Sequence, residues 1–192
     1  LFGENEYNRI GSSRTLAMSS DGGIIAFGSP GRSGDFVFDG QVKIMKFINN
    51  SWVQLGNNIN GKLAYEFLGS SVSISDDGNI VAISGAVPGP FPGGGSDNGF
   101  VRVYQNISGV WTQIGLDLSI MEQSDNFGLA IDISSLGNIL VVGASNGVDL
   151  NAEDTGSVRV YSYSNGNWTQ LGQTLYGESS NDGFGCSVSI SG

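Results

Sequence analysis

Short stretches of alternating apolar and polar residues recur along the chain, each bounded by turn-forming residues. In residues 71–75 valine and isoleucine alternate with serine, and in residues 101–104 two valines alternate with arginine and tyrosine. A period of two places successive side chains on opposite faces of a strand. Residues 80–83 are apolar throughout, which is typical of a strand covered on both faces. No window shows a sustained helical stripe, so the pattern predicts an all-β chain.

The turns between these stretches support the same prediction. Asp21-Gly22 and Asp77-Gly78 stand between two apolar runs, and Leu136-Gly137 takes the same place in a third copy. An Asp-Gly pair in this setting is a strong hairpin signal. The third pair keeps only the glycine, the residue that reaches positive φ without a steric penalty. Each pair therefore predicts a hairpin between the first and second strands of a unit.

Two landmarks show that the chain is built from repeats. A Trp-x-Gln-Leu/Ile-Gly box begins at Trp52, Trp111 and Trp168, and a Gly-x-Val box begins at Gly40, Gly99 and Gly156. Both boxes recur after 59 and then after 57 residues. A fixed period of this size indicates a repeat architecture. With four strand-like runs in each period, the unit matches a four-stranded antiparallel blade of a β-propeller.

The same units resemble FG-GAP repeats. In the third copy, Phe127-Gly128 opens the first strand, residues 142–144 (Val-Gly-Ala) end the second, and residues 156–161 form the third. FG-GAP repeats are the propeller blades of integrin α subunits and of many bacterial secreted and surface proteins. The tryptophan box followed by Leu-Gly-Gln is closer to the bacterial branch. The resemblance covers nearly the whole chain and implies a secreted or cell-surface location.

The repeat register sets the expected organisation of residues 1–192 as one partial propeller. We assign blade 1 to residues 11–66, blade 2 to 67–126 and blade 3 to 127–183, with 184–192 as the first strand of a further blade. Propellers usually close with four to eight blades. Three blades cannot close a ring alone, so the expected partners include the remaining blades of a longer chain or other copies of this one.

Composition narrows the classes of partner. Acidic residues number 18 against 8 basic ones, giving a net charge of −10. This sign argues against a nucleic-acid backbone or an anionic membrane as partner. No apolar run is long enough to span a bilayer, so we expect no membrane insertion. The single cysteine, Cys186, excludes an intrachain disulfide and is expected to be buried and inert.

The lack of histidine restricts the available chemistry. It removes Ser-His-Asp and Cys-His catalysis and imidazole-based zinc sites. A pair of carboxylates, as used in glycoside hydrolysis, is the remaining option, and nothing in the sequence places two acids at a defined separation. We therefore predict no catalytic residues, no cofactor and no enzymatic activity.

Calcium is the one metal that the sequence leaves open. Integrin-type repeats carry several acids in the turn between the first two strands, but residues 75–79 hold two acids, residues 19–22 one and residues 134–137 none. We expect these hairpins to be metal-free. Calcium prefers several oxygen ligands, and one other loop offers them at close spacing, which makes its four oxygen-bearing side chains a candidate site: Asp149, Asn151, Glu153 and Asp154.

The loops between second and third strands differ in length and content while the strands repeat. In a four-stranded blade, such a loop lies on the same rim as the connector between blades. Varied loops on a rigid repeated scaffold commonly form binding surfaces, and integrin propellers bind ligands on this rim. The candidate ligand-binding residues here are Asp35, Phe36, Phe38, Asp39, Phe91 and Asp97.

Two further residue types invite a functional interpretation. The tryptophans could stack on a carbohydrate, but their position on the outer strand of each blade favours packing within or between blades. Asp132 occupies a position that Ala17, Ser73 and Ser189 fill in the other copies. A buried unpaired carboxylate is costly, so we expect Asp132 to accept hydrogen bonds from nearby serines or main-chain N–H groups, as a structural residue.

Taken together, the sequence predicts an extracellular or cell-surface propeller segment that is non-enzymatic and serves adhesion or ligand binding, with a protein or a glycan as its ligand. An alternative is a structural surface-array or filament protein whose blades assemble with other copies. A weaker alternative is a carbohydrate-active enzyme built on a propeller.

Overall fold

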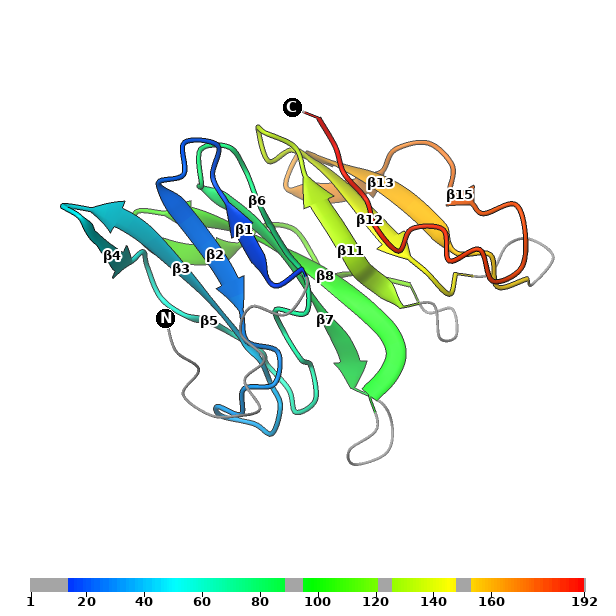
Figure 1. Ribbon diagram of the computed structural model, residues 1–192, viewed down its shortest axis with the longest axis horizontal. Coiled ribbons are helices and arrows are strands. Elements are labelled where there is room, and N and C mark those ends of the chain that lie inside the picture. The colour runs from blue at the N-terminus through cyan, green and yellow to red at the C-terminus, as the bar shows by residue number, and fades with distance from the viewer. Residues whose placement is uncertain (1–13, 89–94, 121–125, 148–152, 192) are drawn as a thin grey trace.

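The fold consists of three antiparallel sheets that follow one another along the chain (Figure 1). The computed structural model describes residues 14–88, 95–120, 126–147 and 153–191. The first sheet contains β1 (Leu16–Met18), β2 (Ile24–Gly28), β3 (Gln41–Ile48), β4 (Ser51–Gln54) and β5 (Ile59–Asn60). The second contains β6 (Val72–Ile74), β7 (Ile80–Pro88), β8 (Gly95–Ile107), β9 (Val110–Gln113) and β10 (Leu118–Ser119). The third contains β11 (Phe127–Ile133), β12 (Ile139–Ala144), β13 (Ser157–Ser164), β14 (Asn167–Gln170) and β15 (Leu175–Tyr176).

Each sheet is a four-stranded meander with one addition from the connector. In the first sheet β1, β2, β3 and β4 pair in chain order, and β5 pairs with the part of β3 that β4 does not reach. The same arrangement recurs in the other two sheets. The expected blade is confirmed, and the connector supplies a fifth short strand because its first residues run back along the free end of the third strand.

The first-strand hairpins turn where the sequence predicts. Gly22, Gly78 and Gly137 have φ values of 71°, 70° and 71°, which only glycine adopts without strain. Each donates its N–H to a serine carbonyl three residues earlier, at 2.8 to 2.9 Å. In the first two hairpins the acid completes the turn, since Ser19 Oγ donates to Asp21 and Ser75 Oγ donates to Asp77.

These bonds lower the pKa of both acids. For Asp21 the main cause is the hydrogen bond from the Ser19 hydroxyl, followed by the bond from the Gly23 N–H. For Asp77 partial burial alone would raise the pKa, but the bonds from the Asn79 N–H and the Ser75 hydroxyl outweigh it. The two carboxylates therefore act as turn-closing acceptors in their charged form.

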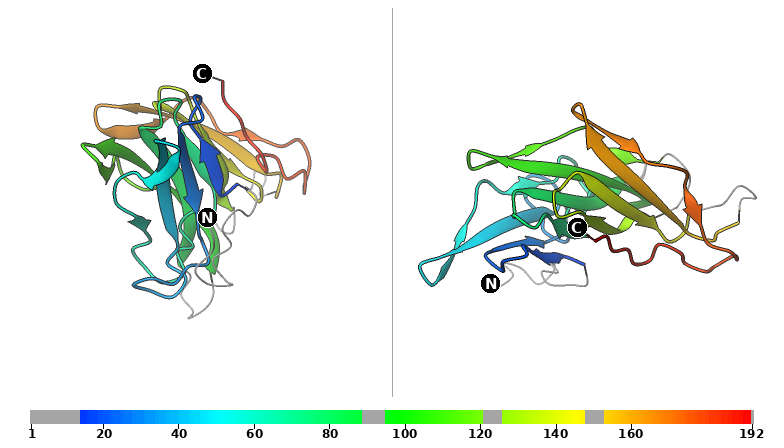
Figure 2. Two further views of the ribbon diagram at one scale, coloured as in Figure 1. Left: turned by 60° about the vertical axis from the view of Figure 1, so that its left-hand side comes forward. Right: turned by 90° about the horizontal axis from the view of Figure 1, so that it is seen from above.

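The hydrophobic core lies between the blades. One cluster joins blades 1 and 2 and includes Ile44, Leu68 and Val81, and another joins blades 2 and 3 and includes Val103 and Leu140. The sheets therefore pack face against face in succession (Figure 2), and the first strand β6 contacts both β1 and β11. This arrangement confirms the predicted β-propeller blades.

Within the described residues, no helix is long and apolar enough to cross a membrane.

Residues 187–191, which lie within the expected first strand of a further blade, do not form a β-strand. Cys186 just before them is exposed, not buried as expected. Its counterpart Ser70 is exposed too, so this position faces solvent in more than one copy.

Candidate functional site

The first strands of the blades bring polar groups together at the inner edge of the sheets. The Val72 N–H donates to the Arg14 carbonyl at 2.8 Å, which links β6 to the residues just before β1. The Ile133 N–H donates to Ser73 Oγ at 3.1 Å, which fastens β11 to β6. The Ile190 N–H donates to Asp132 Oδ2 at 2.9 Å, which fastens residues 187–191 to β11. Side chains at one repeat position therefore link successive inner strands.

Asp132 is the only acid on the described residues of β1, β6 and β11. Its Oδ1 accepts from Ser73 Oγ at 2.7 Å and from the Ile133 N–H at 3.1 Å, while its Oδ2 accepts from Ile190. The expectation that this carboxylate is held by a serine and by main-chain N–H groups is confirmed. A carboxylate offers about four lone-pair sites, so three hydrogen bonds fix its orientation and leave acceptor capacity on a half-buried group.

Arg14 is the cation of this inner edge, and the sequence did not single it out. Its side chain is exposed and its Nη2 donates to the Cys186 carbonyl at 2.8 Å. Its φ is 73°, a conformation that costs a non-glycine residue free energy. Arg14 and Asp132 thus both bind the segment 186–190, whose ends are at most about 14 Å apart even when fully extended.

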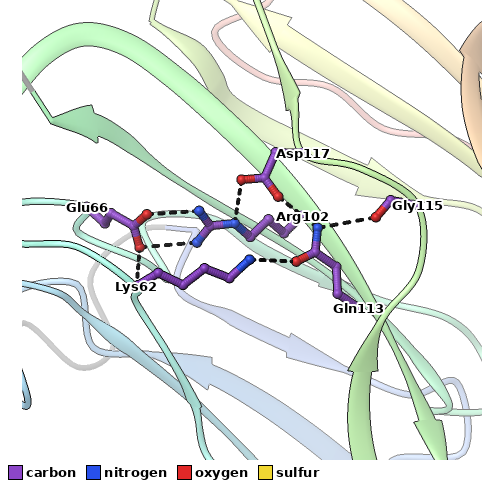
Figure 3. A network of polar contacts seen from close by, with 6 residues as sticks. All are labelled: Lys62, Glu66, Arg102, Gln113, Gly115 and Asp117. Atoms are coloured by element: carbon purple, nitrogen blue, oxygen red, sulfur yellow. Dashed lines mark hydrogen bonds and ion pairs between the residues drawn. The ribbon is translucent and has the colours of Figure 1, made fainter.

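A second polar network lies between blades 1 and 2 and is centred on Arg102 of β8 (Figure 3). Arg102 Nη1 and Nη2 donate to the two carboxylate oxygens of Glu66, at 3.1 and 2.8 Å, and its Nε donates to Asp117 at 2.8 Å. Burial alone would lower the pKa of Arg102, but the bonds and charges of Glu66 and Asp117 raise it. Glu66 and Arg102 are nearly completely buried, so this ion pair is a clamp between blades and is closed to ligands.

The tryptophans also hold the blades together, as predicted. Trp111 Nε1 donates to the Leu55 carbonyl at 2.8 Å and Trp168 Nε1 to the Ile114 carbonyl at 3.2 Å, each acceptor lying in the preceding blade. Both rings are buried. Trp52 of blade 1 is 39% exposed and lies beside Phe47, with ring centroids 5.2 Å apart.

The structure places the predicted rim residues of blade 1 in different environments. Asp35 and Phe36 are exposed, whereas Phe38 stacks on Phe67 of the connector with centroids 5.7 Å apart. Asp39 is fully buried and accepts from the N–H groups of residues 34 and 36. The Asp39 carboxylate therefore binds main-chain groups of its own loop and does not form part of the surface. Its Oδ1 also lies 3.9 Å from Arg32 Nη1.

The other predicted site residues are only partly described. Phe91 lies outside the described residues, and the side chain of Asp97 is not described. Of the proposed calcium loop, Asp149 and Asn151 lie outside as well, while Glu153 is exposed and Asp154 half-buried. In the ranges that the structure describes, no three acidic or cysteine side chains are grouped closely enough to hold a metal ion.

No protein-family model and no curated protein sequence matches the chain. Solved structures do match its fold. A "putative 6-phosphogluconolactonase" from Bacteroides fragilis aligns with a TM-score of 0.51 at 14% identity, over 86% of this chain and 39% of that one. Sqt1 from Saccharomyces cerevisiae aligns with a TM-score of 0.51 at 13% identity, over 89% of this chain and 38% of that one. The chain thus spans about two fifths of each neighbour, and at such identities the likeness shows the fold.

This comparison corrects two predictions made from the sequence. The chain was expected to be a non-enzymatic adhesion module, yet the same blade arrangement occurs in a structure that carries an enzyme's name. The predictions of a non-enzymatic module and of no catalytic activity are therefore withdrawn, because the fold on which they rested also occurs in a protein named as an enzyme. The reasoning from histidine was too broad, because its absence excludes imidazole chemistry and leaves carboxylate chemistry open.

Proposed function

We propose that the chain forms part of an enzyme-type β-propeller that hydrolyses a sugar-derived substrate, such as a sugar lactone, at the inner edge of its blades. The observation that carries the proposal is that an oriented carboxylate, Asp132, and an exposed guanidinium, Arg14, both bind the main chain of residues 186–190. The substrate class is suggested by the name of the Bacteroides fragilis neighbour.

Asp132 and Arg14 would have separate roles in this hydrolysis. Asp132 would act as general base and take a proton from a water molecule, whose oxygen attacks the lactone carbonyl. The ring C–O bond then breaks, and the leaving ring oxygen takes that proton back from Asp132 to give the open-chain hydroxy acid. Arg14 would bind an anionic or strongly polar group of the substrate through its fork of N–H donors. The hydrogen bonds to Ser73 and Ile190 keep the carboxylate in place during the reaction.

Two finer assignments belong to the same proposal. The blades are of the FG-GAP type, supported by the Phe-Gly, Gly-Ala and Gly-x-Val-Arg-Val-Tyr motifs of blade 3. The protein works outside the cytoplasm, supported by that motif likeness and by its acidic, β-rich composition.

The test is a rate measurement on the purified protein. Hydrolysis of δ-gluconolactone and of 6-phosphogluconolactone is followed by acid release in a pH-stat, against the spontaneous rate. We expect a rate above background that Asp132→Asn lowers about 100-fold or more. Asp76→Asn, which changes an exposed acid in the turn between β6 and β7, is the matched control and should leave the rate unchanged. A wild-type rate equal to background, or equal rates for wild type and Asp132→Asn, would overturn the proposal.

A further inference from the structure

The connectors between blades carry an acid at one fixed repeat position. Glu66, Asp125 and Asp182 each stand two residues before the Leu/Phe-Gly pair that opens the next blade. In the first connector Glu66 Oε2 accepts from the Lys62 N–H at 2.5 Å and also binds Arg102 of the following blade. The hydrogen bond within the connector therefore orients the Glu66 carboxylate toward the arginine of the next sheet.

The connector after blade 3 shows the same preparation. Asp182 Oδ2 accepts from the N–H groups of Glu178 and Ser179 at 3.0 and 2.8 Å, and Glu178 is the counterpart of Lys62. Asp182 is exposed, and no arginine reaches it within the described residues. The acidic partner of an ion pair like that of Glu66 and Arg102 in Figure 3 is thus already held in place at this edge, and the arginine is the part that is missing from the described chain.

The tryptophan contact is prepared in the same way. Gly56, Gly115 and Gly172 have φ values of 76°, 75° and 76°, so the three outer-strand turns share one conformation. A Cβ on Gly56 would lie 2.8 Å from the ring of Trp111, and one on Gly115 would lie 2.7 Å from the ring of Trp168. A Cβ on Gly172 would meet nothing within 4 Å. The space above Gly172 therefore holds none of the described residues, whereas the equivalent space above Gly56 and Gly115 is filled by a tryptophan ring.

Apolar positions that are buried at the inner junction are exposed at this edge. Ile59 and Leu68 are 4% and 0% exposed, whereas their counterparts Leu175 and Phe184 are 46% and 41% exposed. Together with Asp182 they line a cavity of about 560 Å³. The edge thus offers an apolar hollow beside an oriented carboxylate.

The inner position of a next blade is already filled. Ile133 of β11 donates its N–H to Ser73, and its counterpart Ile190 donates to Asp132, the counterpart of Ser73. Residues 187–191 thus stand where a first strand stands in the other blades. A whole blade from a second copy would bring its own first strand into this occupied place.

We propose that this edge binds strands two to four of a further blade of the same repeat, which run on from residues 187–191 as β7, β8 and β9 run on from β6. The third strand of that blade brings an arginine to Asp182, and its outer strand lays a tryptophan over Gly172. This inference goes beyond the proposed catalytic function and does not depend on it.

The test extends the full chain after Ser191 with a second copy of its own residues 76–119, which include β7, β8, β9 and β10 of blade 2. The appended copy carries Arg102 and Trp111 in register with Asp182 and Gly172. We expect the extended chain to melt several degrees higher than the parent. Asp182→Asn keeps the loop acceptor and removes the charge, so it should lower the melting temperature of the extended chain by several degrees and leave the parent nearly unchanged.

A double-mutant cycle identifies the contact. Arg102→Ala in the appended copy and Asp182→Asn should each lower the melting temperature, and the two together should cost clearly less than the sum. Additive effects would overturn the proposed pair. Failure of the appended copy to become protected from protease would overturn the docking surface, because the same residues are folded as blade 2. If the parent chain self-associates and Asp182→Asn abolishes the association, the edge binds a second copy of the chain. That result would overturn the proposal of a further blade.

Discussion

The indole N–H of Trp111 donates to the main-chain oxygen of Leu55 in the preceding blade, at 2.8 Å. The ring also lies over Gly56, whose missing side chain leaves the space that the indole fills. Each blade thus inserts one large aromatic side chain into the turn of its neighbour, and the turn must be glycine to receive it. The contact joins residues that are 56 positions apart, so it ties folding of one blade to the next.

The glycine at this turn gives a matched pair of substitutions. Gly56 and Gly172 share a φ of 76°, so alanine at either costs about 1 kcal/mol of backbone strain. At Gly56 the new methyl group would also lie 2.8 Å from Gly109 O and Trp111 Cδ1, whereas at Gly172 it meets nothing. Urea unfolding should show Gly56→Ala losing roughly 2 kcal/mol more stability than Gly172→Ala. Equal losses would show that the indole can move aside without cost.

The clamp between blades 1 and 2 should be sensitive to loss of one partner. Arg102→Met leaves Glu66 charged, buried and unpaired, so we expect a loss of about 3 to 5 kcal/mol in the free energy of unfolding. The double variant Glu66→Gln with Arg102→Met should recover part of that loss. Asp117→Asn is the control, since Asp117 is 37% exposed and should cost at most about 1 kcal/mol. A double variant less stable than Arg102→Met would contradict the stranded-charge explanation.

Stability at alkaline pH should report the burial of Tyr104. Burial raises the pKa of this phenol to about 12, against about 10 in the unfolded chain. The folded state therefore favours the neutral form, and this contribution is complete below pH 10 and lost as pH rises from about 10 to 12. Between pH 9 and 11 the wild type should lose roughly 1 kcal/mol more stability than Tyr104→Phe. Parallel pH profiles for the two proteins would refute the assignment.

The repeat pattern was sufficient to predict the blades, because hairpin glycines and alternating strands are local signals. Asp21-Gly22 and Asp77-Gly78 form their turns with bonds that span only a few residues. The packing role of Trp111 was also predictable, since one tryptophan stands on every outer strand.

The polar contacts between blades were harder to predict. Glu66 and Arg102 are 36 residues apart, and only the joint recurrence of an acid before Leu/Phe-Gly and an arginine in Gly-x-Val-Arg could have paired them. Asp39 was assigned to the binding rim because it lies in the variable loop between the second and third strands, yet the main-chain N–H groups of that loop need a buried acceptor. Arg14 carries no repeat signal, and its role follows from the three-dimensional meeting of residues 14 and 186.

Asp132 offers a last test, which separates its structural contacts from its bulk. Its carboxylate reaches Ser73 Oγ on one side and the Ile190 N–H on the other. Serine, the residue that two other copies use here, keeps one hydroxyl and should lower the melting temperature only slightly. Leucine leaves both donors unpaired and adds bulk between inner strands, so Asp132→Leu should cost roughly 2 kcal/mol or more. Calorimetric melts of the two variants decide the point: if Asp132→Ser melts below Asp132→Leu, the hydrogen-bonding account fails and the charge itself stabilises the inner edge.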